Sequence, residues 1–301
     1  MRLRGHAPKR SRRLMKAAPP GLTNFSFLRR NSMVTRRLAQ ICSAILYNCN
    51  LISDIPAKYI NSEFCVPGLN CRYCPASVAG CPLNFMQQLF AGGLSNLPVR
   101  VLCWLLLLAL AFGRLICGWL CPFGLLQDLL DKIPAPKIPK NEWTHRLSYL
   151  KYIFLAVCIV AIPFGFYLGG QRVVAFCQYV CPNMPFSNFL MTLATGSGIR
   201  PYMIFNYRFA ILIVVIVAAI VMFRPFCRFI CPLGAFYGLF NKIALLSVKV
   251  DDAKCVHCNA CLRACKMDIK KVGDHECISC GECKNACKFG AIHFGWEKTK
   301  K

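Results

Sequence analysis

The sequence has few acidic residues and few histidines. Its 12 Asp and Glu stand against 37 Lys and Arg, which gives a formal net charge of +25. None of the five histidines, at positions 6, 145, 257, 275 and 293, lies deep in an apolar segment. A haem held by two histidines between membrane helices is therefore not expected. The apolar segments also carry almost no acidic residues, so a proton-pumping relay has little support.

Several binding motifs are missing as well. The sequence contains no C-x-x-C-H haem-attachment motif, no G-x-G-x-x-G and no P-loop, so we expect neither haem nor a nucleotide. The positive charge first suggests nucleic acid. The basic residues lie largely beside apolar segments, however, where they set the orientation of membrane helices. No nucleic-acid partner is therefore expected.

Apolar residues and cysteine are in excess. The chain of 301 residues is 56% hydrophobic, and its mean hydropathy of +0.45 is too high for an ordinary soluble domain. The 22 cysteines are clustered along the chain. This clustering favours metal binding in a reducing compartment over a secreted disulfide scaffold.

Four apolar segments have the length of membrane spans, at about residues 38–55, 98–120, 147–168 and 204–223. The basic segments are residues 1–37, the loop 132–146 and the region after Arg224. The positive-inside rule then predicts four spans with both termini in the cytoplasm. Residues 1–37 are interpreted as a basic tail at the cytoplasmic lipid surface.

An internal repeat organises the apolar part. Residues 112–133 align with 222–243 at an offset of 110 positions, and the Cys-Pro pairs at 74–75 and 181–182 match at the similar offset of 107. Parallel repeats of this kind bring like motifs to the same side of a membrane. The aligned identities are Arg114/Arg224, Cys117/Cys227, Cys121/Cys231, Pro122/Pro232, Gly124/Gly234, Leu129/Leu239, Lys132/Lys242 and Ile133/Ile243.

The repeat predicts two groups of four cysteines. The inner set, expected near the cytoplasmic face, is Cys117, Cys121, Cys227 and Cys231, and the outer set is Cys71, Cys74, Cys177 and Cys181. Each set supplies the four thiolates of a [4Fe–4S] cluster. The prolines predict helices that begin at the cysteines and stabilise thiolates by their dipoles. The segments 123–133 and 233–243 are then expected to be interfacial helices.

Other roles for these membrane cysteines remain open. They are candidates for one or two further intramembrane iron–sulfur clusters or metal ions, for a redox-active dithiol or transient copper site, or for purely structural residues. Disulfides are an additional alternative for the outer set, because Cys65 and Cys81 offer extra partners on a face that can be oxidising.

Eight C-terminal cysteines form two copies of C-x2-C-x2-C-x3-C, the spacing of two-cluster ferredoxins. A pair of zinc sites is the alternative. Lys266 and Lys288 replace the proline that usually follows each fourth cysteine, which places positive charge beside the clusters and should favour their reduced state. In the ferredoxin rule the fourth ligand comes from the other half, which assigns Cys255, Cys258, Cys261 and Cys287 to cluster 1 and Cys277, Cys280, Cys283 and Cys265 to cluster 2.

These motifs together resemble a known family. Three features are similar to membrane polyferredoxins of the NapH, NosR and FixG/CcoG type, over residues 35–295: the segment Gly68-Leu69-Asn70-Cys71-Arg72-Tyr73-Cys74-Pro75, the two C-x3-C-P blocks around Cys117/Cys121 and Cys227/Cys231, and the C-terminal double motif. The resemblance implies two [4Fe–4S] clusters on the cytoplasmic side, held by the eight C-terminal cysteines. The flavin-binding domain that precedes the membrane part of NosR has no counterpart in this sequence.

The expected fold is an α-helical membrane protein of about four transmembrane helices in two parallel repeats, with a C-terminal α+β ferredoxin-like domain carrying two [4Fe–4S] clusters. The expected divisions are the tail 1–37, repeat 1 at 38–146, repeat 2 at 147–246 and the ferredoxin domain at 247–301.

The expected function is electron transfer in a bacterial or archaeal cytoplasmic membrane. Electrons would pass between an acidic soluble carrier or partner subunit and a membrane quinone or outer-face acceptor, as in a component of an oxidoreductase of the quinol dehydrogenase type. A thiol-based copper reductase or cofactor-assembly factor, and a redox-sensing membrane regulator, are the alternatives.

Overall fold

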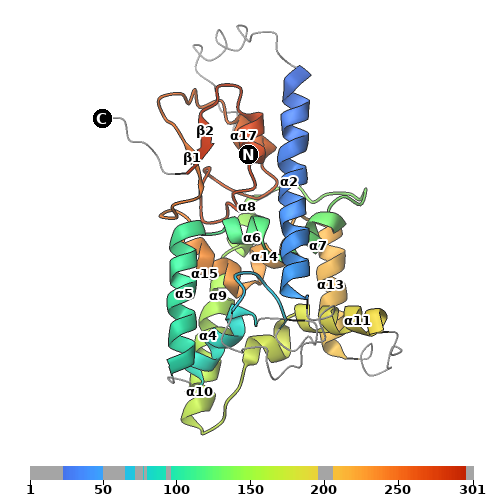
Figure 1. Cartoon of the computed structure of the whole chain (residues 1–301), viewed down its shortest axis with the longest axis vertical. Coiled ribbons are helices and arrows are strands. Elements are labelled where there is room, and N and C mark those ends of the chain that lie inside the picture. Colours follow the sequence, from blue (N-terminus) through green and yellow to red (C-terminus); the bar gives the residue numbers. More distant parts are fainter. Residues whose placement is uncertain are drawn as a thin grey trace.

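The computed structural model of the chain describes residues 23–49, 65–71, 77, 80–92, 96–195 and 206–295. Within these residues the protein is mostly helical, with one small two-stranded sheet near the C-terminus (Figure 1). Residues 1–22 of the predicted tail, the end of the first predicted span and Cys74 lie outside the described residues.

The helical part contains several elements of unequal length. In the first repeat these are α2 (Thr23–Tyr47), α4 (Pro82–Phe90), α5 (Asn96–Phe112), α6 (Leu115–Trp119) and α7 (Pro122–Leu130). Helix α8 (Glu142–Leu147) lies at the junction of the two repeats. In the second repeat the elements are α9 (Leu150–Phe154), the π-helical η1 (Leu155–Ala161), α10 (Ile162–Leu168), the π-helical η2 (Phe176–Val180), α11 (Asn183–Thr195), α13 (Tyr207–Val221), α14 (Pro225–Phe229) and α15 (Pro232–Phe240).

The C-terminal domain is short and built around its cysteine loops. Strand β1 (Val248–Val250) pairs antiparallel with β2 (Ile292–Phe294), with Lys249 opposite His293. Two one-turn helices, α16 (Ala260–Ala264) and α17 (Glu282–Ala286), follow the two cysteine loops and pack on each other. Figure 1 shows this domain at one end of the molecule, with α2 running beside it and beside the helical part.

The predicted spans are only partly matched by long helices. Among the described residues one helix, Glu142–Leu168, is long and apolar enough to cross a membrane. Helix α5 ends at Phe112 because Gly113 adopts a left-handed conformation with φ 52°. Helix α13 has 15 residues, which at 1.5 Å per residue is shorter than a hydrocarbon core of about 30 Å.

Two local expectations differ from the structure. Helix α2 begins at Thr23, inside the segment interpreted as a tail, and its Arg36 is 5% exposed. Helix α15 is buried along Pro232–Gly238, so the prediction of an interfacial helix at 233–243 was wrong. The reason is that the C-terminal domain and α9 cover it; a Cβ on Gly238, for example, would lie 3.1 Å from the His275 carbonyl oxygen.

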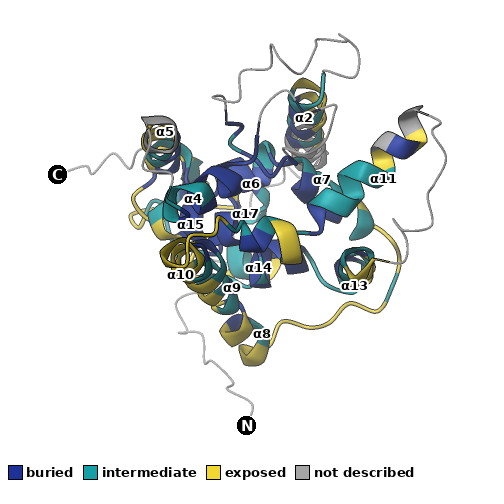
Figure 2. Ribbon diagram, turned by 90° about the horizontal axis from the view of Figure 1, so that it is seen from below, coloured by how far each residue is buried: buried dark blue, intermediate teal, exposed yellow. Residues whose placement is uncertain are grey.

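Figure 2 shows buried residues at the centre of the helical part and exposed residues on the outer parts of several helices. Many of these exposed residues are large and apolar. Exposed apolar surface of this extent marks contact with a membrane or another protein. The exposed residues include Leu38, Ile41 and Ile45 on α2, Trp104, Leu107 and Leu110 on α5, Phe164, Phe166 and Leu168 on α10, and Ile213, Val214 and Val217 on α13.

Buried ion pairs join the C-terminal domain to the helices. Glu276 contacts Arg114 at 2.9 Å and also Lys151, and all three side chains have no exposed area. Burial alone would raise the pKa of Glu276, but the two cations outweigh it and lower that pKa to about 2. Glu276 is therefore ionised, and its charge balances cations that would otherwise be buried without a partner.

Replacing this carboxylate should destabilise the protein. In the Glu276→Gln variant Arg114 and Lys151 remain buried without a counter-charge, which costs about 3–5 kcal/mol. Thermal unfolding in detergent should show a lower midpoint, whereas Asp252→Asn, at an exposed position of the same domain, should leave it unchanged. A wild-type midpoint for Glu276→Gln would contradict the role given to the pair.

Candidate metal centres

Both C-terminal cysteine loops have the same backbone shape. His257 and Asn259 in the first loop have φ 51° and φ 56°, and the equivalent Ser279 and Gly281 in the second have φ 48° and φ 83°. Left-handed residues between the cysteines turn the chain sharply, so successive thiols can face one centre.

The four cysteines assigned to cluster 1 are brought together. They line one cavity of about 620 Å³ that lies between β1, α16 and the segment after α17. The first three come from the loop before and at the start of α16, and the fourth directly follows α17. The members are Cys255, Cys258, Cys261 and Cys287.

The cysteines assigned to cluster 2 are also neighbours. Burial, followed by the nearby thiols of Cys280 and Cys277, raises the pKa of Cys265 to about 12. Burial and the thiols of Cys277, Cys280 and Cys265 likewise raise the pKa of Cys283. Metal clusters bind cysteines as thiolates and release their protons, so this close set of four thiols fits a metal cluster.

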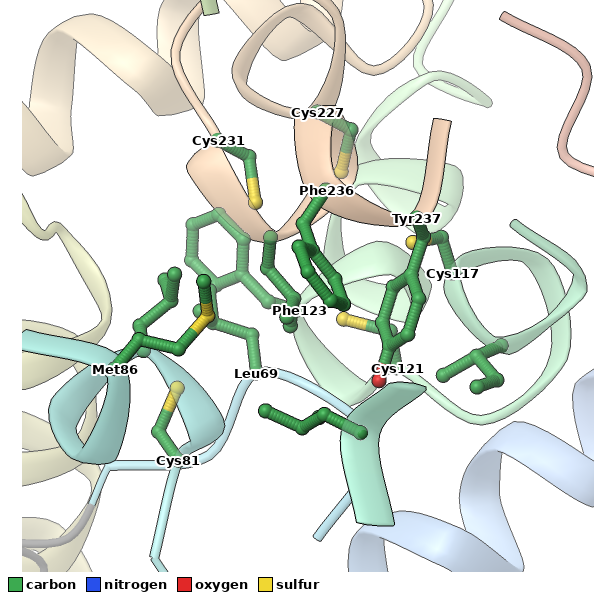
Figure 3. Close-up of a cluster of buried hydrophobic side chains, with 14 of the residues drawn as sticks. Leu69, Cys81, Met86, Cys117, Cys121, Phe123, Cys227, Cys231, Phe236 and Tyr237 are labelled. Carbon is green, nitrogen blue, oxygen red and sulfur yellow. The ribbon is translucent and has the colours of Figure 1, made fainter. Parts of the chain in front are cut away.

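The inner set converges at the centre of the helical part (Figure 3). All four cysteines are buried and line one small cavity together with Leu69, Phe123 and Phe226. Cys121 and Cys231 each precede the proline that begins a nine-residue helix, α7 or α15. The members of the set are Cys117, Cys121, Cys227 and Cys231.

Two arginines cross-link the repeats around this cavity. Arg224 donates to the carbonyl oxygen of Cys117 at 2.7 Å, and Arg114 donates to that of Cys227 at 3.1 Å. The aligned glycines make room for them, because a Cβ on Gly124 would lie 3.2 Å from Arg224 Nη1, and one on Gly234 would lie 3.4 Å from Arg114 Nη2. The two repeats therefore contact each other reciprocally, because the arginine of each repeat binds the cysteine motif of the other.

Asp128 and Gln127 on α7 complete the inner site, and neither was singled out from the sequence. Asp128 binds Arg224 through two hydrogen bonds of 2.6 Å and Arg36 at 2.7 Å. Burial opposes ionisation, yet these arginines hold the pKa of Asp128 below its usual range. Gln127 Nε2 lies 3.2 Å from Cys227 Sγ. A buried amide that donates to a thiol is suited to a thiolate or an anionic cluster.

The inner site lies directly against the second cysteine loop. A Cβ on Gly118 would lie 2.2 Å from the carbonyl oxygen of Ile278, and Trp119 Nε1 donates to the carbonyl oxygen of Ser279 at 3.0 Å. Asn241 Nδ2 donates to the carbonyl oxygen of Cys277 at 3.1 Å. Backbone and side-chain contacts thus join the loop of cluster 2 to the inner cysteine motifs.

Lys266 has a structural partner. Its Nζ lies 2.7 Å from Asp131 at the end of α7, a carboxylate that Lys137 also contacts at 3.1 Å. Lys266 therefore joins the C-terminal domain to the first repeat.

The outer set is only partly assembled as predicted. Cys71, Cys177 and Cys181 line a second small cavity with Leu69, Asn70 and Asn84, while Cys74 lies outside the described residues. The fourth cysteine of this cavity is Cys81. Cys81, Cys177 and Cys181 form no disulfide. In the described part of the chain, no group of three or more His, Cys, Asp or Glu side chains is placed to hold a single metal ion.

Comparison with known proteins identifies relatives of this arrangement. A family model described as "4Fe-4S binding domain" matches residues 96–141 and 207–251. These two segments contain the whole inner set and end before Cys255. No solved structure matches the chain.

Three relatives differ in how much of their length this chain matches. The uncharacterized protein MJ0750 of Methanocaldococcus jannaschii is 31% identical over 199 residues, which cover 63% of this chain and 74% of the relative. The regulatory protein NosR of Pseudomonas aeruginosa is 31% identical over 62% of this chain, but the match spans only 26% of NosR. The ferredoxin-type protein NapH of Escherichia coli is 27% identical over 61% of this chain and 59% of NapH.

The repeat, the cysteine loops and the matched domains define an iron–sulfur protein of the ferredoxin type that serves electron transport. The chain belongs to the NapH/NosR-type family of ferredoxin-type proteins. The resemblance read from its motifs is thereby confirmed.

The contact between Gly118 and the cluster 2 loop can be tested by adding one carbon. The Gly118→Ala variant must displace Ile278, and overpacking of this kind costs about 1–3 kcal/mol. The unfolding midpoint should fall, and the EPR line shape of one reduced cluster should change. Gly165→Ala is the control, because its Cβ would meet nothing within 4 Å. Identical behaviour of the two variants would argue against close packing here.

Proposed function

We propose that this protein is a membrane-bound electron carrier with three stations on its cytoplasmic side. Two are the [4Fe–4S] clusters of the C-terminal domain, and the third is a [4Fe–4S] cluster held by Cys117, Cys121, Cys227 and Cys231. When bound, each cluster supplies one-electron chemistry. The chain's own residues hold these clusters in fixed positions relative to one another.

The contact between the inner cysteine motif and the cluster 2 loop carries this proposal. Gly118 and Trp119, which lie between Cys117 and Cys121, touch the backbone of Ile278 and Ser279, which lie between Cys277 and Cys280. Each of these two residue pairs therefore lies, along the chain, between two proposed ligands of the same cluster. A short path of this kind suits electron transfer between the two centres. The match of the 4Fe–4S domain model to the inner cysteines supports the same assignment.

The membrane location is supported by the exposed apolar faces of α2, α5, α10 and α13 and by the long apolar helix Glu142–Leu168. We propose four spans with both termini in the cytoplasm. Where a helix is too short to cross the membrane alone, the adjoining segments of the chain complete the span. The electron acceptor is a membrane quinone or a carrier at the outer face. A hydrocarbon core of about 30 Å makes intermediate stations necessary for transfer across it.

The donor is proposed to be an acidic soluble carrier that docks over cluster 1. Positive charge around a redox centre steers acidic partners to it. Five lysines, most of them exposed, line the cavity that Cys255, Cys258, Cys261 and Cys287 share: Lys242, Lys249, Lys254, Lys270 and Lys271.

Metal content tests the inner station. Full-length protein purified without oxygen should lose about four irons and four sulfides per chain when Cys117 or Cys227 is replaced by alanine. Cys158→Ala is the control, since Cys158 packs against the same core but lines neither cysteine cavity. An unchanged iron content per chain in the Cys117→Ala and Cys227→Ala variants would contradict the proposal. Deleting the C-terminal domain is a poorer test, because it leaves Arg114 and Lys151 without Glu276.

Docking can be tested by the kinetics of reduction. The second-order rate constant for reduction by an acidic ferredoxin should fall as ionic strength rises. It should fall several-fold in the double variant Lys270→Gln/Lys271→Gln, because rim charges act mainly on association. Arg146→Gln is the control at an exposed position of α8. Rates that do not depend on salt would exclude an acidic docking partner.

A further inference from the structure

The second cavity of the helical part has the same construction as the inner site. It is lined by Cys71, Cys81, Cys177 and Cys181, and Leu69 lines both cavities. Figure 3 shows Leu69 between Cys81 and the inner cysteines. We propose that these four cysteines bind a further iron–sulfur cluster, in which Cys81 is the counterpart of Cys121.

The first argument is a local repeat that is not evident from cysteine spacing. The stretch Cys81-Pro82 to Leu89 and the stretch Cys121-Pro122 to Leu129 share the pattern C-P-x4-Q-x-L. Each begins a helix of nine residues with its cysteine at the N-cap and its proline in the first turn. In both helices the thiol therefore lies at the positive end of the helix dipole.

The second argument is the contact made by the glutamine of each pattern. Gln127 Nε2 lies 3.2 Å from the thiol of Cys227, the first cysteine of one C-x3-C-P motif. Gln87 Nε2 lies 3.0 Å from the thiol of Cys177, the first cysteine of another C-x3-C-P motif. Both glutamines are buried. The two cavities thus pair a C-P helix with a C-x3-C-P motif in the same way.

Hydrogen-bond donors surround the second cavity. Asn84 lines it and is 2% exposed, and its Nδ2 makes no hydrogen bond of normal geometry in the described structure, although its side chain faces the thiol of Cys177. A buried amide without a partner is costly, and the sulfurs of an anionic cluster would supply the missing acceptor. Backbone N–H groups of Leu83 and Asn183 also face the thiols of Cys81 and Cys181.

The position of this cavity gives the cluster a role that rests on the proposed function. The loop of residues 65–71 runs from the inner cavity, lined by Pro67 and Gly68, to the second, lined by Asn70 and Cys71. With both clusters bound, one electron would pass from the inner cluster to the new one. One ferrous iron of the inner cluster would become ferric and one ferric iron of the new cluster would become ferrous, with no bond formed or broken and no proton moved. The cluster would extend the electron path beyond the inner site.

Metal analysis of full-length protein purified without oxygen tests the assignment. Wild-type protein should hold about sixteen irons per chain, and Cys81→Ala and Cys177→Ala should each lose about four. Cys117→Ala should lose a different four, seen as the loss of a different EPR signal. Cys158→Ala is again the control.

The outcomes separate this inference from the proposed function. About twelve irons, lowered by Cys117→Ala but not by Cys81→Ala, would overturn the new cluster and keep the inner one. About eight irons would overturn both. Zinc or copper in place of iron, lost with Cys81→Ala, would overturn the iron–sulfur assignment, and loss with Cys74→Ala but not with Cys81→Ala would overturn the choice of ligand.

If the cysteine variants do not fold, the midpoint potentials of the clusters in glutamine variants provide the test. Hydrogen bonds to the sulfurs help to set cluster potentials, so Gln87→Leu should lower the midpoint potential of one EPR signal without changing iron content. Gln127→Leu should lower the midpoint of a different signal. If both variants shift the same signal, or Gln87→Leu shifts none, the second cluster is excluded.

Discussion

The buried guanidinium of Arg114 is the contact on which the arrangement of the three parts depends. It donates to Glu276 and the carbonyl of His275 in the C-terminal domain, and to the carbonyl of Cys227 in the second repeat. Burying an arginine completely is expensive, so this side chain is stable only where all of these acceptors are present together. Arg114 therefore contacts the ferredoxin domain and the second repeat at the same time, and the ion pair between Lys266 and Asp131 and the hydrogen bond from Trp119 to Ser279 support the same arrangement.

Arg224 repeats this design with a different partner. It binds the carbonyl of Cys117 and the carboxylate of Asp128, which also binds Arg36 on α2. One arginine thus joins the repeats to the C-terminal domain, and the other joins them to α2. Because each arginine holds the cysteine loop of the opposite repeat, neither repeat can form the inner cavity alone. The duplication has produced one site with halves that depend on each other.

The cysteine motifs and the repeat were predictable from the sequence, because ligand spacing is local and Arg114 aligns with Arg224. The partners of these arginines were not, since nothing in the spacing of Asp128 or Glu276 indicates which cation they meet. The predicted span 98–120 extends beyond helix α5, because hydropathy does not register the left-handed turn at Gly113 that ends this helix at Phe112. The predicted span 147–168, by contrast, lies within the long apolar helix Glu142–Leu168. Cys81 was treated only as an extra partner, although the pattern it shares with Cys121 was present in the sequence. Cysteine spacing alone does not reveal the glutamine that follows each of these two cysteines by six residues.

Close packing explains why these sites occupy the centre of the molecule. Gly68 allows the loop of residues 65–71 to approach the inner motif, since a Cβ there would lie 3.1 Å from the carbonyl oxygen of Leu120 and 3.2 Å from Cys121 Cα. Gly118 allows the same motif to approach the cluster 2 loop from the other side. Any side chain at either position would separate neighbouring cysteine sites. Electron transfer weakens steeply with distance, so these two glycines matter to function through the separations that they permit.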